Sequence, residues 1–523
     1  MVALFAWVNA IFEWFTPISN IAWEFPTNLN WYANIPVLGQ LSFAVLLLVG
    51  VGIYLTIATR FVQFTSIPKI VRMMLRTKPS KIGISAIASF LFGLAMRAGP
   101  GNIVGITGAI SVGGPGALFW MWVVAFFGMS TAFTESVLAQ LFKERKQDEF
   151  VGGLPFYGKR LLGNKRIFGL ILSLAFIVYA LANVPFQTFY VFTGIGTIVD
   201  TLSGLPTNKQ SVLYYGIAIV LIISCAFIIL GGIRRVTAYT DYLVPIKAAL
   251  FCLTSLVIIM VNLPLLPYFF QEVFVGALSP HAIFGGTFGV AFSQGVKRGL
   301  MSNEAGQGTI TMAAAVADND HPCEQGLVQS LGVCFDTMVI CTLTGFIVVM
   351  AHVWTGTIDG QAWESVKASK FVIYLASVQS LVPHDLATIF KIIMGTCFTL
   401  FAFTTLLGMI SFAEISANFI SKKPAFILCI RVLGSLIFVP FGALTLLSGR
   451  ELGNLWVITD LTNILMVYLN IPLLIIGTPI VCKVLKHYRQ TGGKSFLSQQ
   501  ELGIYTDYWT TSQTQFKAKK QSN

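Results

Sequence analysis

Apolar residues form long stretches along most of this chain, and shorter polar segments separate them. A membrane-spanning helix needs about 20 consecutive, mainly apolar residues, whereas a surface helix of a soluble protein is apolar along one face only. The stretches are of the first kind, so they predict an all-α membrane protein with about eleven transmembrane helices. The predicted spans are 38–58, 83–112, 116–142, 167–199, 211–231, 241–263, 281–300, 326–350, 386–412, 425–447 and 455–482.

Basic residues are concentrated in alternate loops between these spans. They follow the odd-numbered spans and fill the tail, whereas the opposite loops carry only Lys209, Lys367, Lys370 and Arg450. Short loops rich in Lys and Arg stay in the cytoplasm. The pattern therefore predicts an N-terminus outside, a cytoplasmic C-terminus and an odd number of spans. We expect a multi-pass protein of the cell membrane, in particular a bacterial inner membrane.

Composition changes this picture little, but it excludes several functions. The chain is 55% hydrophobic and 11% charged, against roughly 25% charged in soluble proteins. Its net charge of +12 comes from alternate loops, so nucleic acid is not an expected partner. Eight cysteines and five histidines show no metal or redox spacing, and no nucleophile motif or P-loop is present. We therefore expect no catalytic residues, no enzyme activity and no organic cofactor.

Three segments are predicted. Residues 1–36 are an extracytoplasmic interfacial segment rich in aromatic residues, which favour the membrane surface; a substrate gate is the alternative for them. Residues 37–485 form the transmembrane domain, and 486–523 a basic cytoplasmic tail, which we expect to be solvated. The aromatic residues of the first segment are Phe5, Trp7, Phe12, Trp14, Phe15, Trp23 and Trp31.

A helix-breaking sequence lies in the middle of the second predicted span. Residues 83–114 exceed the length that a spanning helix needs, and Gly99, Pro100 and Gly101 lie near their centre. Proline lacks an N–H and clashes with the preceding turn. Non-helical backbone persists at membrane depth only where protein or a polar cavity satisfies its polar groups. Such freed groups can hold an ion or a zwitterion, so we predict a binding site at this break.

A second glycine-rich stretch, 284–289, lies five spans later, in the seventh predicted span. Because five is odd, two five-helix units at about 83–263 and 281–482 would have opposite orientations, as in the inverted repeats of secondary transporters. Close helix packing is the alternative use of these glycines. Their pairing with the first break favours a second helix break at 284–289.

Long sequence motifs accompany these breaks. They are RAGPGNIVG at 97–105, GGPGA at 113–117 with FWMW at 119–122, GVKRGLMSNEAG at 295–306, HP at 321–322 with QGLVQ at 325–329, and FAFTT at 401–405. Together they resemble the alanine/glycine:cation symporter family, over about residues 38 to 485. The resemblance implies a LeuT-type 5+5 inverted repeat with one additional N-terminal span. It also implies uptake of a small neutral amino acid, alanine or glycine, coupled to inward sodium movement by alternating access.

The resemblance assigns roles to the first break. Gly99, Gly101 and Asn102 match the unwound stretch whose amides meet the substrate carboxylate. Pro100 is a departure, because the family usually has Thr at this position. One N–H and one hydroxyl group are therefore missing beside the carboxylate site, and the identity of the amino acid does not follow from the family alone.

Other matched positions extend the substrate site. Gln187 matches a family glutamine that is suited to polar groups of the substrate, although contacts with neighbouring helices are an alternative for a buried amide. Thr287, Phe288 and Gly289 would offer acceptors to the substrate ammonium. Phe288 would also shape a small side-chain pocket, with plain packing as its alternative.

The same resemblance implies sodium ligands. The side-chain oxygen of Asn102 would bind one ion, and the carbonyl oxygens of Ala95 and Ala98 with the hydroxyl groups of Thr404 and Thr405 would bind a second. A hard cation prefers such oxygen ligands.

Ionisable residues inside predicted spans are costly and point to function. Four of them are candidates here: Arg97, Glu135, Asp336 and Asp460. For Arg97 the alternatives are a structural ion pair and a gate or proton relay. Lys297, Arg298 and residues 302–304 are a candidate inner gate, with contact to lipid headgroups and helix capping as the alternative. A glutamine transporter of the same family remains an alternative function, as does an ion channel, whereas a membrane enzyme has little support.

Overall fold

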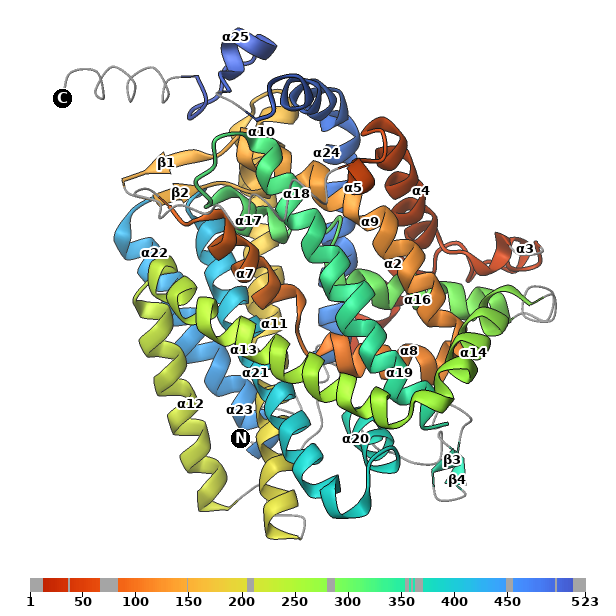
Figure 1. Ribbon diagram of the computed structural model, residues 1–523. Coiled ribbons are helices and arrows are strands. Elements are labelled where there is room, and N and C mark those ends of the chain that lie inside the picture. Colours follow the sequence, from red (N-terminus) through yellow and green to blue (C-terminus); the bar gives the residue numbers. More distant parts are fainter. Residues whose placement is uncertain are drawn as a thin grey trace.

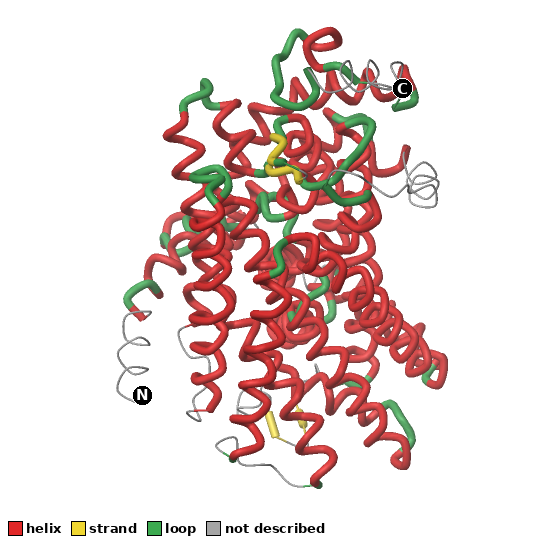
Figure 2. The backbone as a smooth tube through the Cα atoms, turned by 90° about the vertical axis from the view of Figure 1, so that its left-hand side faces the viewer, coloured by secondary structure: helices red, strands yellow, loops and turns green. Residues whose placement is uncertain are grey.

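Long helices pack side by side into one bundle in the computed structural model (Figures 1 and 2). Eight helices of the described part are long and apolar enough to span a membrane, and the bent pair Ala86–Arg97 and Gly101–Gly113 adds a ninth. The described part of each predicted span is mainly helical, so the all-α membrane class is confirmed, while the count of eleven stays a prediction. The structure describes residues 13–35, 38–65, 83–147, 149–204, 211–279, 287–352, 357–358, 361–362, 370–447, 455–493 and 496–510.

The N-terminal segment is attached to the bundle by a buried tryptophan. Trp23 donates its indole N–H to the carbonyl of Asp460 at 3.0 Å, and Lys297 Nζ lies 4.7 Å from its ring centre. Trp14 and Trp31 are exposed, as the interfacial prediction expects, whereas Trp23 belongs to the core. Phe5, Trp7 and Phe12 lie outside the described residues. The elements here are α2 (Thr16–Glu24), α3 (Asn30–Ala33), η1 (Leu38–Gln40), α4 (Phe43–Ala58) and α5 (Val62–Thr65).

The first five-helix unit begins where Ser85 caps α7, accepting a hydrogen bond from the N–H of Ala88 at 3.2 Å. A short antiparallel hairpin, β1–β2, follows its second membrane helix. The elements are α7 (Ala86–Arg97), η2 (Gly101–Gly105), α8 (Ile106–Gly113), α9 (Gly116–Leu141), β1 (Glu144–Lys146), β2 (Glu149–Val151), α10 (Leu154–Leu161), α11 (Arg166–Ser203), α12 (Val212–Leu230) and α13 (Ile233–Val261). The connection to the second unit contains η3 (Leu263–Leu265) and α14 (Leu266–Leu278).

The second unit begins with α16, which ends at Asn303, and a short helix and then long helices follow. Its first helix, α16, contacts η2 at the first break. The elements are α16 (Thr287–Asn303), α17 (Ile310–Ala315), α18 (Pro322–Val333), η4 (Cys334–Cys341), α19 (Thr342–Met350), β3 (Thr357–Ile358), β4 (Gln361–Ala362), α20 (Lys370–Ser380), α21 (His384–Ala417), α22 (Pro424–Val432), η6 (Leu433–Phe438), α23 (Val439–Leu447), α24 (Leu455–Thr491) and α25 (Ser498–Leu502).

The outer face of α12 is apolar, and small residues line the interior. Ile219, Ile223 and Phe227 are more than half exposed on α12, which suits contact with lipid chains. Inside, α11 and α21 approach so closely that a Cβ on Gly194 would lie 3.1 Å from the carbonyl oxygen of Gly395. Small residues allow such close backbone packing in membranes.

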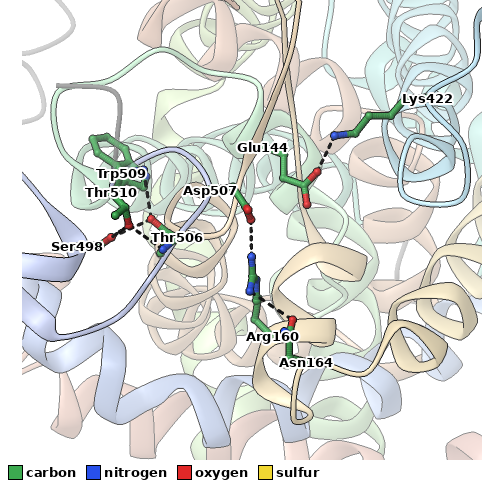
Figure 3. Close-up of polar contacts among 9 residues, drawn as sticks. All are labelled: Glu144, Arg160, Asn164, Lys422, Ser498, Thr506, Asp507, Trp509 and Thr510. Atoms are coloured by element: carbon green, nitrogen blue, oxygen red, sulfur yellow. Dashed lines mark hydrogen bonds and ion pairs between the residues drawn. The ribbon is translucent and has the colours of Figure 1, made fainter. Parts of the chain in front are cut away.

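The C-terminal segment docks on the end of the bundle that carries β1, β2 and α25 (Figure 1). Trp509 is 1% exposed and donates its indole N–H to the carbonyl of Gln140 at 2.7 Å. Figure 3 shows the polar contacts around it, including Asp507 with Arg160 at 2.6 Å. The sequence predicted a solvated tail from residue 486, and within this part of it Phe496, Ser498, Thr506 and Trp509 are instead buried.

Trp509→Ala is expected to release this segment. The substitution removes a large buried side chain and one hydrogen bond, and truncating a buried Trp costs about 3 to 5 kcal/mol. Limited proteolysis of the purified protein should then cut residues 496–510 at least about 10-fold faster, since 1.4 kcal/mol corresponds to a factor of ten. Tyr505→Ala, an exposed position in the same segment, is the control and should leave the rate unchanged. Equal cleavage rates in both variants would contradict the docking.

Candidate functional site

The first helix break lies where the sequence predicts it. The chain bends by 51° between α7 and the helix that starts at Gly101, and the backbone leaves the helical region at Ala98, where ψ is 76°. Carbonyl groups of the last turn lose their helical partners here. The carbonyl of Ala95 accepts a hydrogen bond from Thr405 Oγ1 at 3.1 Å. Side chains of other helices therefore satisfy the freed groups.

The second break follows α16. Glu304, Gly306 and Gly308 have positive φ angles of 56°, 94° and 77°, which end the right-handed helix. The sequence predicted this break at 284–289. For residues 287–289 that prediction is wrong, because they belong to α16; residues 284–286 lie outside the described residues, so a break there stays a prediction. A glycine does not by itself break a helix whose hydrogen bonds continue, whereas several residues with positive φ angles do.

Buried polar side chains hold the second break open. Glu135 Oε2 accepts hydrogen bonds from the N–H of Gly308 at 3.1 Å and from Asn470 Nδ2 at 2.9 Å. Asn470 Nδ2 also donates to the carbonyl of Gly306 at 3.0 Å, and Tyr157 donates its hydroxyl to Asn470 Oδ1 at 2.5 Å. The sequence singled out Glu135 as an intramembrane carboxyl group. Its carboxylate accepts the hydrogen bond that the N–H of Gly308 would otherwise give to a carbonyl of a continuous helix.

Arg97 connects the two breaks. Its Nε donates to the carbonyl of Asn303 at 3.0 Å, and its Nη1 donates to the carbonyl of Gln329 at 2.9 Å. The ion pairs of the described part do not include Arg97. A structural ion pair, one of the two alternatives from the sequence, is thus not what holds it; the guanidinium group instead binds backbone at the end of α16 and on α18.

A cavity of about 60 Å³ lies between the two breaks. Roughly 10–15 Å³ of such space holds one water molecule, so this cavity has room for a small solute. Gly99, Gly101 and Gln187, three of the predicted substrate residues, line it. The full lining is Met96, Arg97, Gly99, Pro100, Gly101, Val104, Gly105, Tyr179, Asn183, Phe186, Gln187, Tyr190, Arg298, Met301, Glu304, Thr405, Met409, Thr459 and Asn463.

The structure does not bring Thr287, Phe288 and Gly289 to this cavity. They begin α16, whereas Met301, near its other end, lines the cavity. Twelve residues of helix, counted from Gly289 to Met301, span about 18 Å at 1.5 Å per residue. A Cβ on Gly289 would collide with Gln40, so this glycine serves close packing, the alternative that the sequence left open.

Asp336 forms the centre of a buried polar cluster beside the first break. Asn102 Nδ2 donates to Asp336 Oδ1 at 2.7 Å, Thr337 Oγ1 donates to Oδ2 at 3.3 Å, and Ser302 also donates to Oδ2. Asn102 Oδ1 accepts from the N–H of Gly99 at 3.0 Å. Asp336 lies in η4, a π-helical turn, and such turns occur frequently at functional sites. The sequence placed Asp336 in a span but gave no partner for it.

The four residues predicted to bind a second sodium ion also lie together, and a lysine joins them. Thr404 and Thr405 contact the carbonyl of Ala95 at 3.3 and 3.1 Å. Lys247 Nζ donates to the carbonyl of Ala98 at 2.7 Å and to Thr404 Oγ1 at 2.5 Å. The sequence analysis missed Lys247, although a lone cation within the predicted span 241–263 is a signal that could have found it.

Comparison with known proteins identifies the family. The sequence model of the Sodium:alanine symporter family matches residues 28–501. The chain belongs to this family. Amino-acid carrier protein AlsT of Bacillus subtilis is 33% identical over 460 residues, 88% of this chain and 92% of that protein. Probable sodium/glutamine symporter GlnT of the same organism is 32% identical over 453 residues, 85% of this chain and 87% of that protein.

A further relative supports the family, and a solved structure identifies the fold. Sodium/alanine symporter AgcS of Methanococcus maripaludis is 36% identical over 318 residues, 59% of this chain and 68% of that protein. The crystal structure of MhsT in complex with L-phenylalanine has a TM-score of 0.51 at 12% identity and covers 78% of this chain and 89% of that one. The predicted LeuT-type fold is therefore confirmed.

Family membership fixes the general activity. The chain is a sodium-coupled amino acid symporter, a multi-pass membrane transporter rather than an enzyme. Its relatives are named for both alanine and glutamine, so membership leaves the amino acid open.

Proposed function

We propose that this symporter takes up a small neutral amino acid, alanine or glycine, together with sodium by alternating access. The observation that carries the proposal is the cavity between the two helix breaks. Broken helices at the interface of inverted repeats are where secondary transporters bind their substrates. The small volume, with apolar side chains such as Val104, Phe186 and Met409 in the lining, favours a short apolar side chain.

The two ends of a zwitterion have different partners in this cavity. The substrate carboxylate lies toward Gly99 and Gly101, and the Arg97 guanidinium group supports it from the same side, because its Nη2 is buried without a hydrogen-bond partner. The substrate ammonium lies toward the end of α16, where Met301 and Glu304 line the cavity. Met301 and Glu304 take the place of residues 287–289 as the proposed partners of the ammonium group, because residues 287–289 lie too far from the cavity along α16.

Sodium binds in the Asp336 cluster, together with Asn102, Ser302 and Thr337. Asp336 is fully buried and is in none of the ion pairs of the described part. A buried carboxylate is costly unless a cation compensates its charge, and oxygen ligands suit sodium. Asn102 takes part in both this cluster and the first break, which supports coupling between the ion and the amino acid. By linkage, each would raise the affinity for the other by the same factor.

The orientation follows from the positive loops. The N-terminus lies outside and the C-terminus in the cytoplasm, so sodium and the amino acid move toward the end that carries α25.

Uptake into proteoliposomes tests the function. Labelled alanine should accumulate only when an inward sodium gradient is imposed, and choline should not replace sodium. Alanine and glycine should compete, and glutamine should compete only if the cavity accepts the longer side chain of the alternative substrate. Equal alanine binding in sodium and in choline media would contradict coupling, and uptake that does not saturate would favour a channel.

Gln187→Leu tests the substrate site. Gln187 Oε1 is buried without a hydrogen-bond partner and the residue lines the cavity, so it is free to bind a substrate group. Losing one hydrogen bond costs about 0.5 to 1.5 kcal/mol. KM for alanine should therefore rise about 2- to 10-fold, with the sodium requirement retained.

Asn183→Leu is the matched control for Gln187. It lines the same cavity, but its amide donates to the carbonyl of Tyr179 within its own helix at 2.8 Å. Uptake by this variant should keep the wild-type KM. A similar increase of KM in both variants would indicate a general effect on packing.

A further inference from the structure

Lys247 brings a cationic side chain into the membrane interior, against the first helix break. It lies on α13 and is fully buried. Its Nζ contacts one oxygen on each of two other elements: the carbonyl of Ala98 after α7 at 2.7 Å, and Thr404 Oγ1 on α21 at 2.5 Å. The aromatic ring of Phe401 lies 5.1 Å away. None of the ion pairs in the described ranges involves Lys247.

The oxygen atoms around this amino group have the chemistry of a cation site. Besides the two that it contacts, Ala95 O and Thr405 Oγ1 lie together at 3.1 Å, and Thr404 Oγ1 contacts the same carbonyl at 3.3 Å. Carbonyl and hydroxyl oxygens without a carboxylate suit a monovalent cation. A sodium ion and the Lys247 amino group cannot share this space, because both need the carbonyl of Ala98 and the hydroxyl of Thr404.

We propose that the amino group of Lys247 permanently fills the second cation position, so that one sodium ion, rather than two, accompanies each amino acid. The inference rests on the proposed function, in which the transported sodium binds in the Asp336 cluster. The lysine supplies the contacts between α7 and α21 that a second sodium ion would make. Because it is covalently attached to α13, it cannot leave with the substrate and contributes nothing to the driving force.

The stoichiometry of the wild-type protein is the primary test. In proteoliposomes, the membrane potential at which net alanine flux stops, measured at a fixed sodium gradient, gives the number of sodium ions per alanine. We expect a ratio of one. A ratio of two would overturn the inference while leaving sodium-coupled uptake intact. Absence of any sodium-driven uptake would instead contradict the proposed function, so the two failures are distinguishable.

Lys247→Ala tests the position itself. The substitution opens the space and leaves the oxygen atoms for an ion. The Hill coefficient of sodium-dependent alanine uptake should rise from about 1 toward 2, since this coefficient is limited by the number of sites. Lys247→Met fills the same volume without a hydrogen-bond donor, and its Hill coefficient should stay near 1. A Hill coefficient that is unchanged in folded Lys247→Ala protein would contradict the inference.

Lys143→Met is the matched control. Lys143 is equally buried, and its Nζ donates to the carbonyl of Ala317 at 2.6 Å, away from both breaks. Its loss should lower folded yield without changing sodium cooperativity. If Lys247→Ala does not fold, the number of sodium ions per alanine in the wild-type protein alone decides whether Lys247 fills the second cation position.

Discussion

Asp336→Asn is expected to raise the sodium concentration for half-maximal alanine uptake at least about 100-fold, which corresponds to about 2.7 kcal/mol. The substitution keeps the shape of the side chain and removes its charge. In the proposed site this carboxylate is the single anionic ligand of the transported ion, and contacts to charged groups contribute about 1.5 to 3 kcal/mol each. The measurement is initial uptake into proteoliposomes as a function of sodium concentration.

The polar cluster around Asp336 makes the substitution informative. Asn102 Nδ2 and the Ser302 hydroxyl donate to its two oxygens, so an amide at this position also presents an unsuitable donor. Sodium affinity should fall strongly while the folded yield changes little. The reason is that, within the described residues, Asp336 has no ion-pair partner that the substitution would leave unpaired.

Glu414→Gln is the matched control for Asp336. Glu414 is also buried, but Arg431 pairs with it through Nε at 2.8 Å and Nη2 at 2.5 Å. Breaking a buried pair leaves an uncompensated charge and destabilises the fold. This variant should lose thermal stability and keep its sodium affinity. Wild-type sodium affinity in Asp336→Asn would remove Asp336 from the ion site.

Arg97→Gln is expected to lower folded yield severely. The guanidinium group donates to the carbonyls of Asn303 and Gln329 and to Gln329 Oε1, and a shorter neutral side chain cannot reach all three. Buried carbonyl groups left unpaired cost about 1 to 3 kcal/mol each. Monodisperse protein recovered after purification and its apparent melting temperature should both fall. Alanine uptake per folded molecule should fall less, because Arg97 only supports the proposed carboxylate site.

Arg298→Gln separates a structural role from a role in the cavity. Arg298 lines the same cavity, and its Nη1 contacts Met301 Sδ at 3.1 Å on its own helix. Its loss should leave folded yield close to that of the wild type. If Arg97→Gln gave a normal yield and no uptake, Arg97 would act as a gate or relay, the alternative that the sequence raised.

Local sequence predicted the first break well, and it missed the break that follows α16. At 99–101, proline and two glycines prevent continued helix through their own backbone chemistry. At 284–289 the glycines look similar, but Gly289, the one that the structure describes, lies within α16. The break at 304–309 contains Gly306 and Gly308, and the sequence analysis placed these residues just after the predicted span 281–300. Its polar residues lower the hydropathy there, although Glu135 and Asn470 keep this segment inside the protein.

The sequence by itself determined the membrane class, the positions of the helices and the first break. These depend on lengths of apolar stretches and on residues that break helices, which act over a few neighbours along the chain. Only the tertiary structure decided that Lys247 lies against Ala98, that Asn102 bonds to Asp336 and that Trp509 docks on Gln140. Those partners are 149, 234 and 369 residues apart. Their contacts exist because packing brings distant helices together, and each buried polar group must then find its partner among them.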